Sequence, residues 1–162
     1  MPKQTVVVNA TPCISLALIG QFQLLQLLYK TIIIPPAVQR EVLVGGAQYI
    51  GVTELKQASW VKTIPLQNPR QADLLVDLDR GEAEVIILAQ ERQADVVIID
   101  ERLGRRYAKR VGLTVTGTLG VLLKAKSEGH IPLVAPLVQK LVQGGIHLSS
   151  AVVVRTIQMA GE

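Results

Sequence analysis

The hydrophobic and polar positions at the start of the chain predict a strand followed by helix. Residues 5–8 are a β-branched run that ends at Asn9. Thr11 can cap a helix and Pro12 can occupy its first position, and apolar residues continue at helical spacing on both sides of Gly20. We therefore expect one strand and then one or two short helices.

The same alternation continues along the rest of the chain, apart from residues 47–59, which are weakly patterned. Further strands are expected over residues 31–34, 60–66, 95–100 and 113–115, and helices over residues 37–44, 69–78, 81–90, 103–111 and 118–127. Residues 132–160 are expected to form two C-terminal helices, with Ser149 capping the second. The run 96–99 is apolar throughout, which is typical of a central parallel strand covered on both faces. The pattern predicts a single domain over residues 1–162, a three-layer α/β/α fold with a parallel central sheet.

Composition narrows the class of protein. Only 3% of the 162 residues are aromatic, which argues against binding of single strands on stacked aromatic rings, and the net charge of +4 permits an anionic partner without requiring one. The single cysteine, Cys13, excludes an internal disulfide and suits a reducing cytoplasm. The uncharged stretch between Lys3 and Lys30 is interrupted by Pro12 and four glutamines, so it does not resemble a membrane span. We expect a soluble, cytoplasmic protein.

Candidate chemistry gathers where the predicted strands end. Asn9 and Asp100 close two strands, Glu82 begins the helix before the second of them, and Glu41 lies in the helix after residues 31–34. Ligand sites of open parallel sheets lie outside the carboxyl ends of the strands. Three carboxylates and one carboxamide in a small volume favour a bound cation, and oxygen ligands without His or Cys suit Mg²⁺ or Mn²⁺.

Each of these residues also has a structural interpretation. Asn9 can serve as a turn or cap residue, Glu41 as a solvated helix residue, and Glu82 as a helix N-terminal acid stabilised by the dipole. Glu84, two positions after Glu82, is expected at the surface, and Glu101 is expected to be a supporting or solvated residue.

A basic segment follows Asp100. Arg102, Arg105, Arg106, Lys109 and Arg110 lie within nine positions, and on a helix residues 102, 106 and 109 share one side. Such a ridge beside an acidic pocket could neutralise phosphates without reading sequence. The alternative is an ordinary solvated face.

Five segments, in order along nearly the whole chain, carry a resemblance to a known family: residues 6–12, 34–42, 79–86, 97–102 and 116–120. The chain resembles the PIN-like nucleases, in particular the branch related to VapC-type toxins of bacterial toxin–antitoxin pairs. The resemblance implies a PIN-like fold in which four acidic positions hold one or two divalent ions for RNA cleavage. Those positions correspond here to position 9, Glu41, Glu82 and Asp100. Most members carry Asp where this chain has Asn9, and the missing charge is expected to weaken Mg²⁺ binding.

The sequence therefore predicts a Mg²⁺-dependent endoribonuclease, the toxin of a pair, that cleaves single-stranded RNA with Glu41, Glu82 and Asp100 as catalytic residues. A small antitoxin protein is the expected partner, a homodimer is an open alternative, and no membrane partner is expected. The alternative function is a PIN-like binding module that lost catalysis with the charge at position 9 and engages RNA or a small protein. A phosphoacceptor receiver domain is disfavoured, because strand one does not end in an acidic pair and Thr116 stands where strand five would supply a lysine.

Overall fold

The computed structural model describes residues 3–45 and 49–162 and contains a five-stranded sheet in the order β3-β2-β1-β4-β5. All its pairings are parallel. The strands are β1 (Val6–Val8), β2 (Ile32–Ile34), β3 (Val61–Thr63), β4 (Val96–Ile98) and β5 (Val115–Thr116). The predicted parallel sheet is thus confirmed. Each strand is shorter than the range predicted for it from the sequence.

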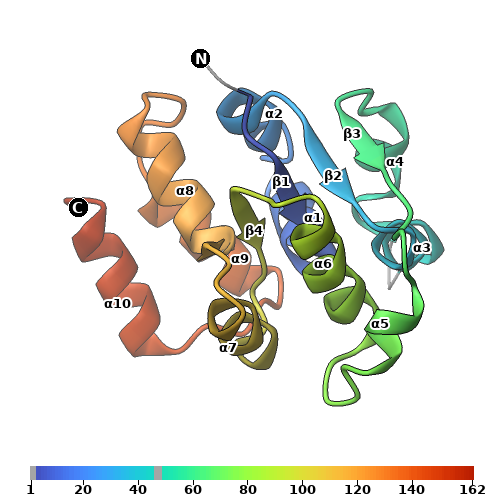
Figure 1. Ribbon diagram of the computed structural model, residues 1–162. Helices are drawn as coiled ribbons and strands as arrows, with labels where there is room; N and C mark the ends of the chain where they lie inside the picture. The colour runs from blue at the N-terminus through green and yellow to red at the C-terminus, as the bar shows by residue number, and fades with distance from the viewer. Residues whose placement is uncertain (1–2, 46–48) are drawn as a thin grey trace.

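Helices cover both faces of the sheet, so the molecule has the predicted three layers (Figure 1). α1 and α2 contact α8 on one side, whereas α6 packs with α5 and α7 on the other and contacts β1. The helices before β4 are α1 (Ala10–Leu18), α2 (Leu24–Tyr29), α3 (Pro36–Val44), α4 (Val52–Gln57), α5 (Arg70–Asp73) and α6 (Arg80–Glu91). Those after β4 are α7 (Arg102–Arg110), α8 (Thr118–Ser127), α9 (Ala135–Gln143) and α10 (Ser150–Met159).

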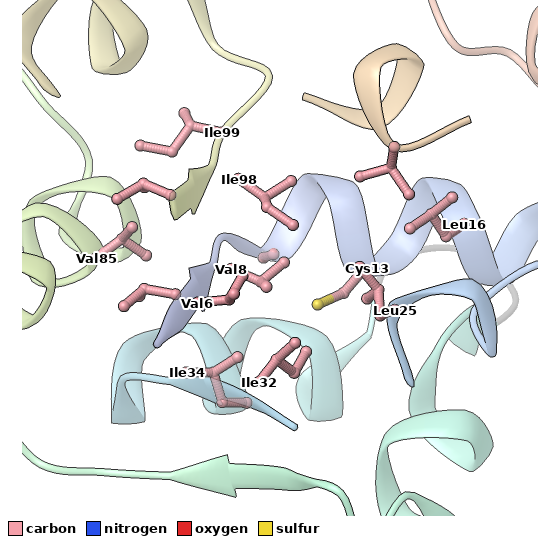
Figure 2. Packing of buried hydrophobic residues seen from close by; sticks show 14 of the residues in the cluster. Val6, Val8, Cys13, Leu16, Leu25, Ile32, Ile34, Val85, Ile98 and Ile99 are labelled. Atoms are coloured by element: carbon pink, nitrogen blue, oxygen red, sulfur yellow. The ribbon is translucent and has the colours of Figure 1, made fainter. Parts of the chain in front are cut away.

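The core is aliphatic and centres on β1 and β4. Val8, Ile98 and Ile99 are fully buried, and the helices on the two faces contribute Leu16 from α1 and Val85 from α6 (Figure 2). Burial of both faces explains why these strands carry apolar residues at successive positions. Because the core holds β1 and β4 in register, it also fixes the polar residues that follow them.

The first helix begins two residues earlier than predicted. Asn9, not Thr11, occupies the N-cap position of α1, and Pro12 is the third helical residue. The Asn9 backbone N–H still donates to the Ile98 carbonyl at 2.9 Å, so the strand pairing runs directly into the helix. Pro12 is tolerated because N–H groups in the first turn of a helix have no intrahelical partner.

Two other segments differ from the predicted pattern. The helix expected over residues 69–78 shrinks to the single turn of α5, and the following loop leaves Leu74 and Val76 exposed. The weakly patterned residues 47–59 contain α4, while Gly46, predicted with Gly45 to end the helix before it, lies outside the described residues. Gly45 does end α3, with a left-handed φ of 75°.

The C-terminal helices form as predicted, and their ends are capped. Ser149 accepts a hydrogen bond from the Val152 N–H at 3.2 Å at the start of α10. The Glu162 carboxylate accepts from the N–H groups of Val134 and Ala135 at the start of α9 and pairs with Lys126 of α8. These contacts tie α9 and α10 to α8. Within residues 3–45 and 49–162, no helix has the length and apolarity needed to cross a bilayer.

Candidate functional site

The strand order places the candidate site at the carboxyl ends of β1 and β4. The order in which strands are added to the sheet reverses here, since β2 and β3 lie on one side of β1 and β4 and β5 on the other, and Val8 pairs with Ile98 where β1 and β4 end. Open α/β sheets form a crevice at such a switch point. Asn9 follows β1 directly and Asp100 follows β4 by two residues, so both predicted residues lie at this crevice.

Oxygen atoms from three parts of the chain meet around Gly81 in the first turn of α6. A β-carbon at position 81 would lie 3.3 Å from Glu41 Oε1 and 3.5 Å from each of Asn9 Oδ1 and Asp79 Oδ1. We call this arrangement the Gly81 cradle. Asn9 is 4% exposed and makes no cap hydrogen bond to α1, so its side chain is oriented toward the cradle instead of the helix it precedes.

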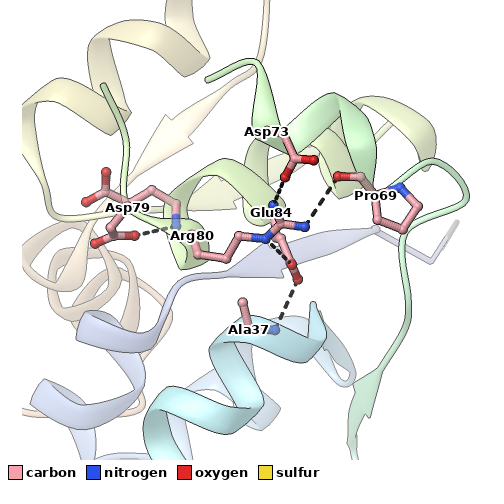
Figure 3. A network of polar contacts seen from close by, with 7 residues as sticks. Ala37, Pro69, Asp73, Asp79, Arg80 and Glu84 are labelled. Atoms are coloured by element: carbon pink, nitrogen blue, oxygen red, sulfur yellow. Dashed lines mark hydrogen bonds and ion pairs between the residues drawn. The ribbon is translucent and has the colours of Figure 1, made fainter. Parts of the chain in front are cut away.

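Asp79 is a member of the cradle that sequence reasoning did not select. It is the N-cap of α6, and its Oδ1 accepts a hydrogen bond from the Glu82 N–H at 2.8 Å (Figure 3). An aspartate three residues before a glutamate at a helix start, as Asp79 is before Glu82, is a recognisable capping signal, so the sequence did contain evidence for its position. Its proximity to Glu41 depends on the packing of α3 against α6, which cannot be predicted from the spacing of residues within either segment.

Glu82 lies beside the cradle in a crowded, negatively charged setting. It is 6% exposed, and its pKa is raised to about 7 by burial and by the charges of Asp79 and Glu101. Burial and the same two charges also raise the pKa of Glu41. Helix α7 packs closely beside Glu82, since a β-carbon at Gly104 would lie 3.2 Å from Ile99 Cγ2 and 3.6 Å from Glu82 Oε2. Repulsion among these groups favours a bound cation.

Asp100 is oriented toward α8. Its Oδ1 accepts from the Thr118 backbone N–H at 2.7 Å and its Oδ2 from the Thr118 hydroxyl at 2.6 Å. Gly117 permits this approach, because a β-carbon there would lie 2.6 Å from Asp100 Oδ1 and 2.9 Å from Arg105 Nη1. Cys13 lies close to both Asp100 and the cradle residue Glu41. Burial raises the pKa of its thiol to about 12, and the charges of Asp100 and Glu41 contribute to this shift.

The structure thus brings the predicted residues together in two groups. Asn9 and Glu41 meet at the cradle, and Glu82 follows Gly81 directly. Asp100 is held at the start of α8 by Thr118. Their role as ligands and catalytic residues remains a prediction.

Glu84 corrects the expectation of a surface residue. It is 5% exposed, accepts from the Arg80 guanidinium at 2.7 Å and from the Ala37 N–H at 3.1 Å (Figure 3). Arg80 also pairs with Asp73 and donates to the Pro69 carbonyl. Glu84 is buried because α3 packs against this turn of α6, and it links α6 to the helix that carries Glu41.

The basic segment forms α7, in which some basic side chains are exposed to solvent and one, Arg105, is half-buried. Arg102, Arg106 and Lys109 are exposed, as predicted for a ridge. Arg105 is half-buried, and its Nη1 donates to the Ile99 carbonyl at 2.9 Å, so it lies beside Asp100. Contact of the ridge with RNA remains a prediction.

The donor set determines which cofactor the site could hold. Among residues 3–45 and 49–162, no three His, Cys, Asp or Glu side chains are grouped closely enough to hold a metal ion. The cradle combines two carboxylates with the Asn9 amide, which supplies a neutral oxygen ligand. Oxygen donors around a position without a side chain fit a hard cation such as Mg²⁺ or Mn²⁺ in kind.

Comparison with models of protein families identifies a match over nearly the whole chain. A family model described as DUF3368: PIN domain matches residues 5–162. A search among curated proteins finds no match. The matched region contains every element of the sheet and both groups of candidate residues.

Proposed function

The chain belongs to the PIN-domain family, a nuclease-type fold, and we propose that it is a Mg²⁺-dependent endoribonuclease acting on single-stranded RNA. The observation that carries the proposal is the convergence of Asn9, Glu41 and Asp79 oxygens at the Gly81 cradle. The cradle lies at the carboxyl edge of the sheet, where open α/β folds bind their ligands. The buried Glu82 adjoins it.

The residues that would hold the ion are Asn9, Glu41 and Asp79, with Glu82 and Asp100 reaching it through water. A divalent ion supplies a nucleophilic hydroxide from water and stabilises charge on the phosphate. The chain's own contribution is to keep these oxygens in place through the α6 cap and the Thr118 hydrogen bonds. Oxygen ligands on rigid elements give the site a defined geometry before substrate arrives.

The exposed face of α7 supplies the affinity for substrate. Arg102, Arg106 and Lys109 lie on the helix that begins directly after Asp100 and Glu101. Cations on this face attract the RNA backbone and offset the repulsion between phosphate and the acidic residues. Because phosphate contacts do not read bases, this face provides affinity and not sequence preference.

We further infer that the enzyme is the toxin of a toxin–antitoxin pair, with a small antitoxin protein as its partner. The support is the resemblance of five ordered segments to VapC-type toxins. Covering the acidic site and the α7 face would be sufficient for an antitoxin to block cleavage, since both lie on the same edge of the sheet.

One observation favours a second function. Asn9 supplies an amide where most PIN-like nucleases have a carboxylate, and this lowers the negative charge available to a metal. A site with weakened metal affinity could retain the α7 face and bind RNA without cutting it. The second candidate is therefore a binding module that uses the same surface.

Cleavage of a labelled, unstructured RNA separates the two functions. We expect the wild type to cleave with Mg²⁺ or Mn²⁺ and to stop in chelator, and Asp100→Asn to lose cleavage while keeping its circular dichroism spectrum. The Asn side chain can still accept from the Thr118 N–H, so the fold should persist. Cleavage that survives chelator, or full activity of Asp100→Asn, would exclude the proposed mechanism. Tight RNA binding without cleavage by the wild type would assign the binding module.

A further inference from the structure

A second recess adjoins the acidic site on the side of the C-terminal helices. It has a volume of about 780 Å³ and lies between α1, β5, the start of α8 and the loop that joins α9 to α10. We call it the α8–α10 cavity. Its volume falls within the range of about 300–1,000 Å³ found for pockets that bind small molecules. Asp100 and Glu101, which follow β4, are among its lining residues, so it adjoins the crevice between β1 and β4.

Ser15 is the residue that points to a ligand. It lines the cavity from α1, is 1% exposed, and its Oγ is buried with no hydrogen-bond partner in the part of the chain that the structure describes. A helical serine usually satisfies its hydroxyl on the carbonyl four residues earlier. Buried hydroxyls without partners are unfavourable and uncommon, so this one is suited to an incoming polar group.

The walls define the chemistry of that group. The lining combines aliphatic residues, Leu119, Leu141, Leu148 and Val152, with the hydroxyl-bearing residues Thr11, Thr116 and Ser149. A flat heterocycle with polar edges can place its faces on such aliphatic side chains and its edges on hydroxyls.

Arg105 contributes a positively charged side chain to the same cavity. Its guanidinium uses Nη1 for the Ile99 carbonyl, while the planar fork carries further N–H donors suited to phosphate. Asp100 and Glu101 also line the cavity and repel a free anion, so we expect the phosphate to bind against the Arg105 guanidinium.

We propose that the α8–α10 cavity binds one nucleoside of the RNA strand, with its base against the aliphatic wall, an edge at Ser15 and its phosphate at Arg105. The proposal rests on the proposed function, because it makes the cavity the nucleoside subsite of the same acidic site. It also supplies the base contact that the α7 face lacks. The identity of this nucleoside would then set a preference for where the strand is cut.

The test measures binding without catalysis. The ¹⁵N-labelled chain is titrated in chelator with AMP, CMP, GMP and UMP while amide shifts are recorded. We expect at least one nucleotide to move the amides of Ser15, Thr118 and residues 145–149. Val152→Trp, which fills the cavity from α10, should reduce these shifts at least about tenfold. Val154→Trp is the matched control, since Val154 lines a different groove between α9 and α10.

Ser15→Ala separates a ligand-binding role from a structural one. Removing an unpaired hydroxyl should leave the midpoint of thermal unfolding unchanged or higher, whereas nucleotide affinity falls about two- to tenfold through one lost hydrogen bond. A lower midpoint with unchanged affinity would assign Ser15 to the fold alone. Shifts that are absent, lie elsewhere, or persist in Val152→Trp would overturn the cavity proposal. Failure of the wild type to cleave RNA would instead overturn the proposed function and leave this binding result intact.

Discussion

Asp100 accepts two hydrogen bonds from one residue, Thr118, through its backbone N–H at 2.7 Å and its hydroxyl at 2.6 Å. Thr118 is 4% exposed and begins α8. The end of β4 is thereby joined to the helix that follows β5 in the chain, and the carboxylate has a fixed direction. Its orientation depends on a residue 18 positions away in sequence.

Thr118→Val should reduce both stability and cleavage. The substitution keeps the shape but removes the hydroxyl donor to Asp100 Oδ2, at a cost of about 1–3 kcal/mol of unfolding free energy. A misdirected ligand should lower cleavage roughly 10- to 100-fold, as loss of supporting hydrogen bonds does in metal sites. Thr118→Ser keeps the hydroxyl and is the control. Urea unfolding and RNA cleavage measure the two effects, and equal cleavage by the Val and Ser variants would show that Asp100 needs no such support.

Glu84 is predicted to stabilise the junction of α3 and α6. Glu84→Gln keeps an acceptor for the Ala37 N–H but loses the charge pair with Arg80, and should cost about 1 kcal/mol. Glu84→Ala leaves that N–H buried and unpaired and should cost about 3 kcal/mol. Asp73→Asn is the control, because Asp73 pairs with the same arginine at an exposed position and should cost under about 1 kcal/mol. Urea denaturation curves decide, and equal losses in all three variants would refute the role of burial.

Arg106 is predicted to contact the RNA backbone. Arg106→Ala should weaken binding of a single-stranded RNA modestly at every sequence and reduce the slope of log affinity against log salt by about 1, because one phosphate contact is lost. Arg92→Ala removes the same charge from an exposed residue at the C-terminal end of α6, the end opposite the cradle. This control should change neither the affinity nor the salt slope. Fluorescence anisotropy over a salt series provides the measurement. Identical slopes for both variants would mean that α7 is only a solvated face.

Local pattern was sufficient to predict the sheet and to place Asn9 and Asp100 after its strands. The β-branched run of β1 and the apolar run 96–99 in and after β4 indicated buried parallel strands, and the polar residues after them, Asn9 and Asp100, could be located from strand ends alone. Both inferences use spacing within one segment. Such spacing is set by whether one or both faces of a strand are buried.

Contacts between segments could not be predicted in the same way. The burial of Glu84 depends on Arg80 in its own helix and on Ala37 in another, and the place of Asp79 in the cradle depends on how α3 approaches α6. Both Thr11 and Asn9 are residue types that favour the N-cap position. Asn9 occupies it because its backbone N–H is held by the Ile98 carbonyl, so the helix begins directly after β1. The structure is therefore most informative about side chains that contact a different helix or strand from their own.

Position 9 allows the metal hypothesis to be tested in both directions. Asn9→Asp places a third carboxylate beside Glu41 and Asp79, so Mn²⁺ should bind more tightly, by about 1–4 kcal/mol at effective dielectric constants of roughly 80 to 20. The same change should lower the stability of the metal-free protein, because the added charge is repelled by its neighbours.

Gly81→Ala should act in the opposite direction. Its methyl group would lie 3.3 Å from Glu41 Oε1 and occupy the space between the donors, so Mn²⁺ binding should weaken. The stability of the metal-free fold should change by less than about 1 kcal/mol, since the helix preference of alanine over glycine is opposed by the tight contact with Glu41 Oε1. Calorimetric titration with Mn²⁺ and thermal unfolding in chelator measure the two quantities for both variants. If Asn9→Asp binds no more tightly than the wild type and Gly81→Ala binds equally well, the ion does not occupy the cradle, and the acidic residues at this edge of the sheet require another explanation.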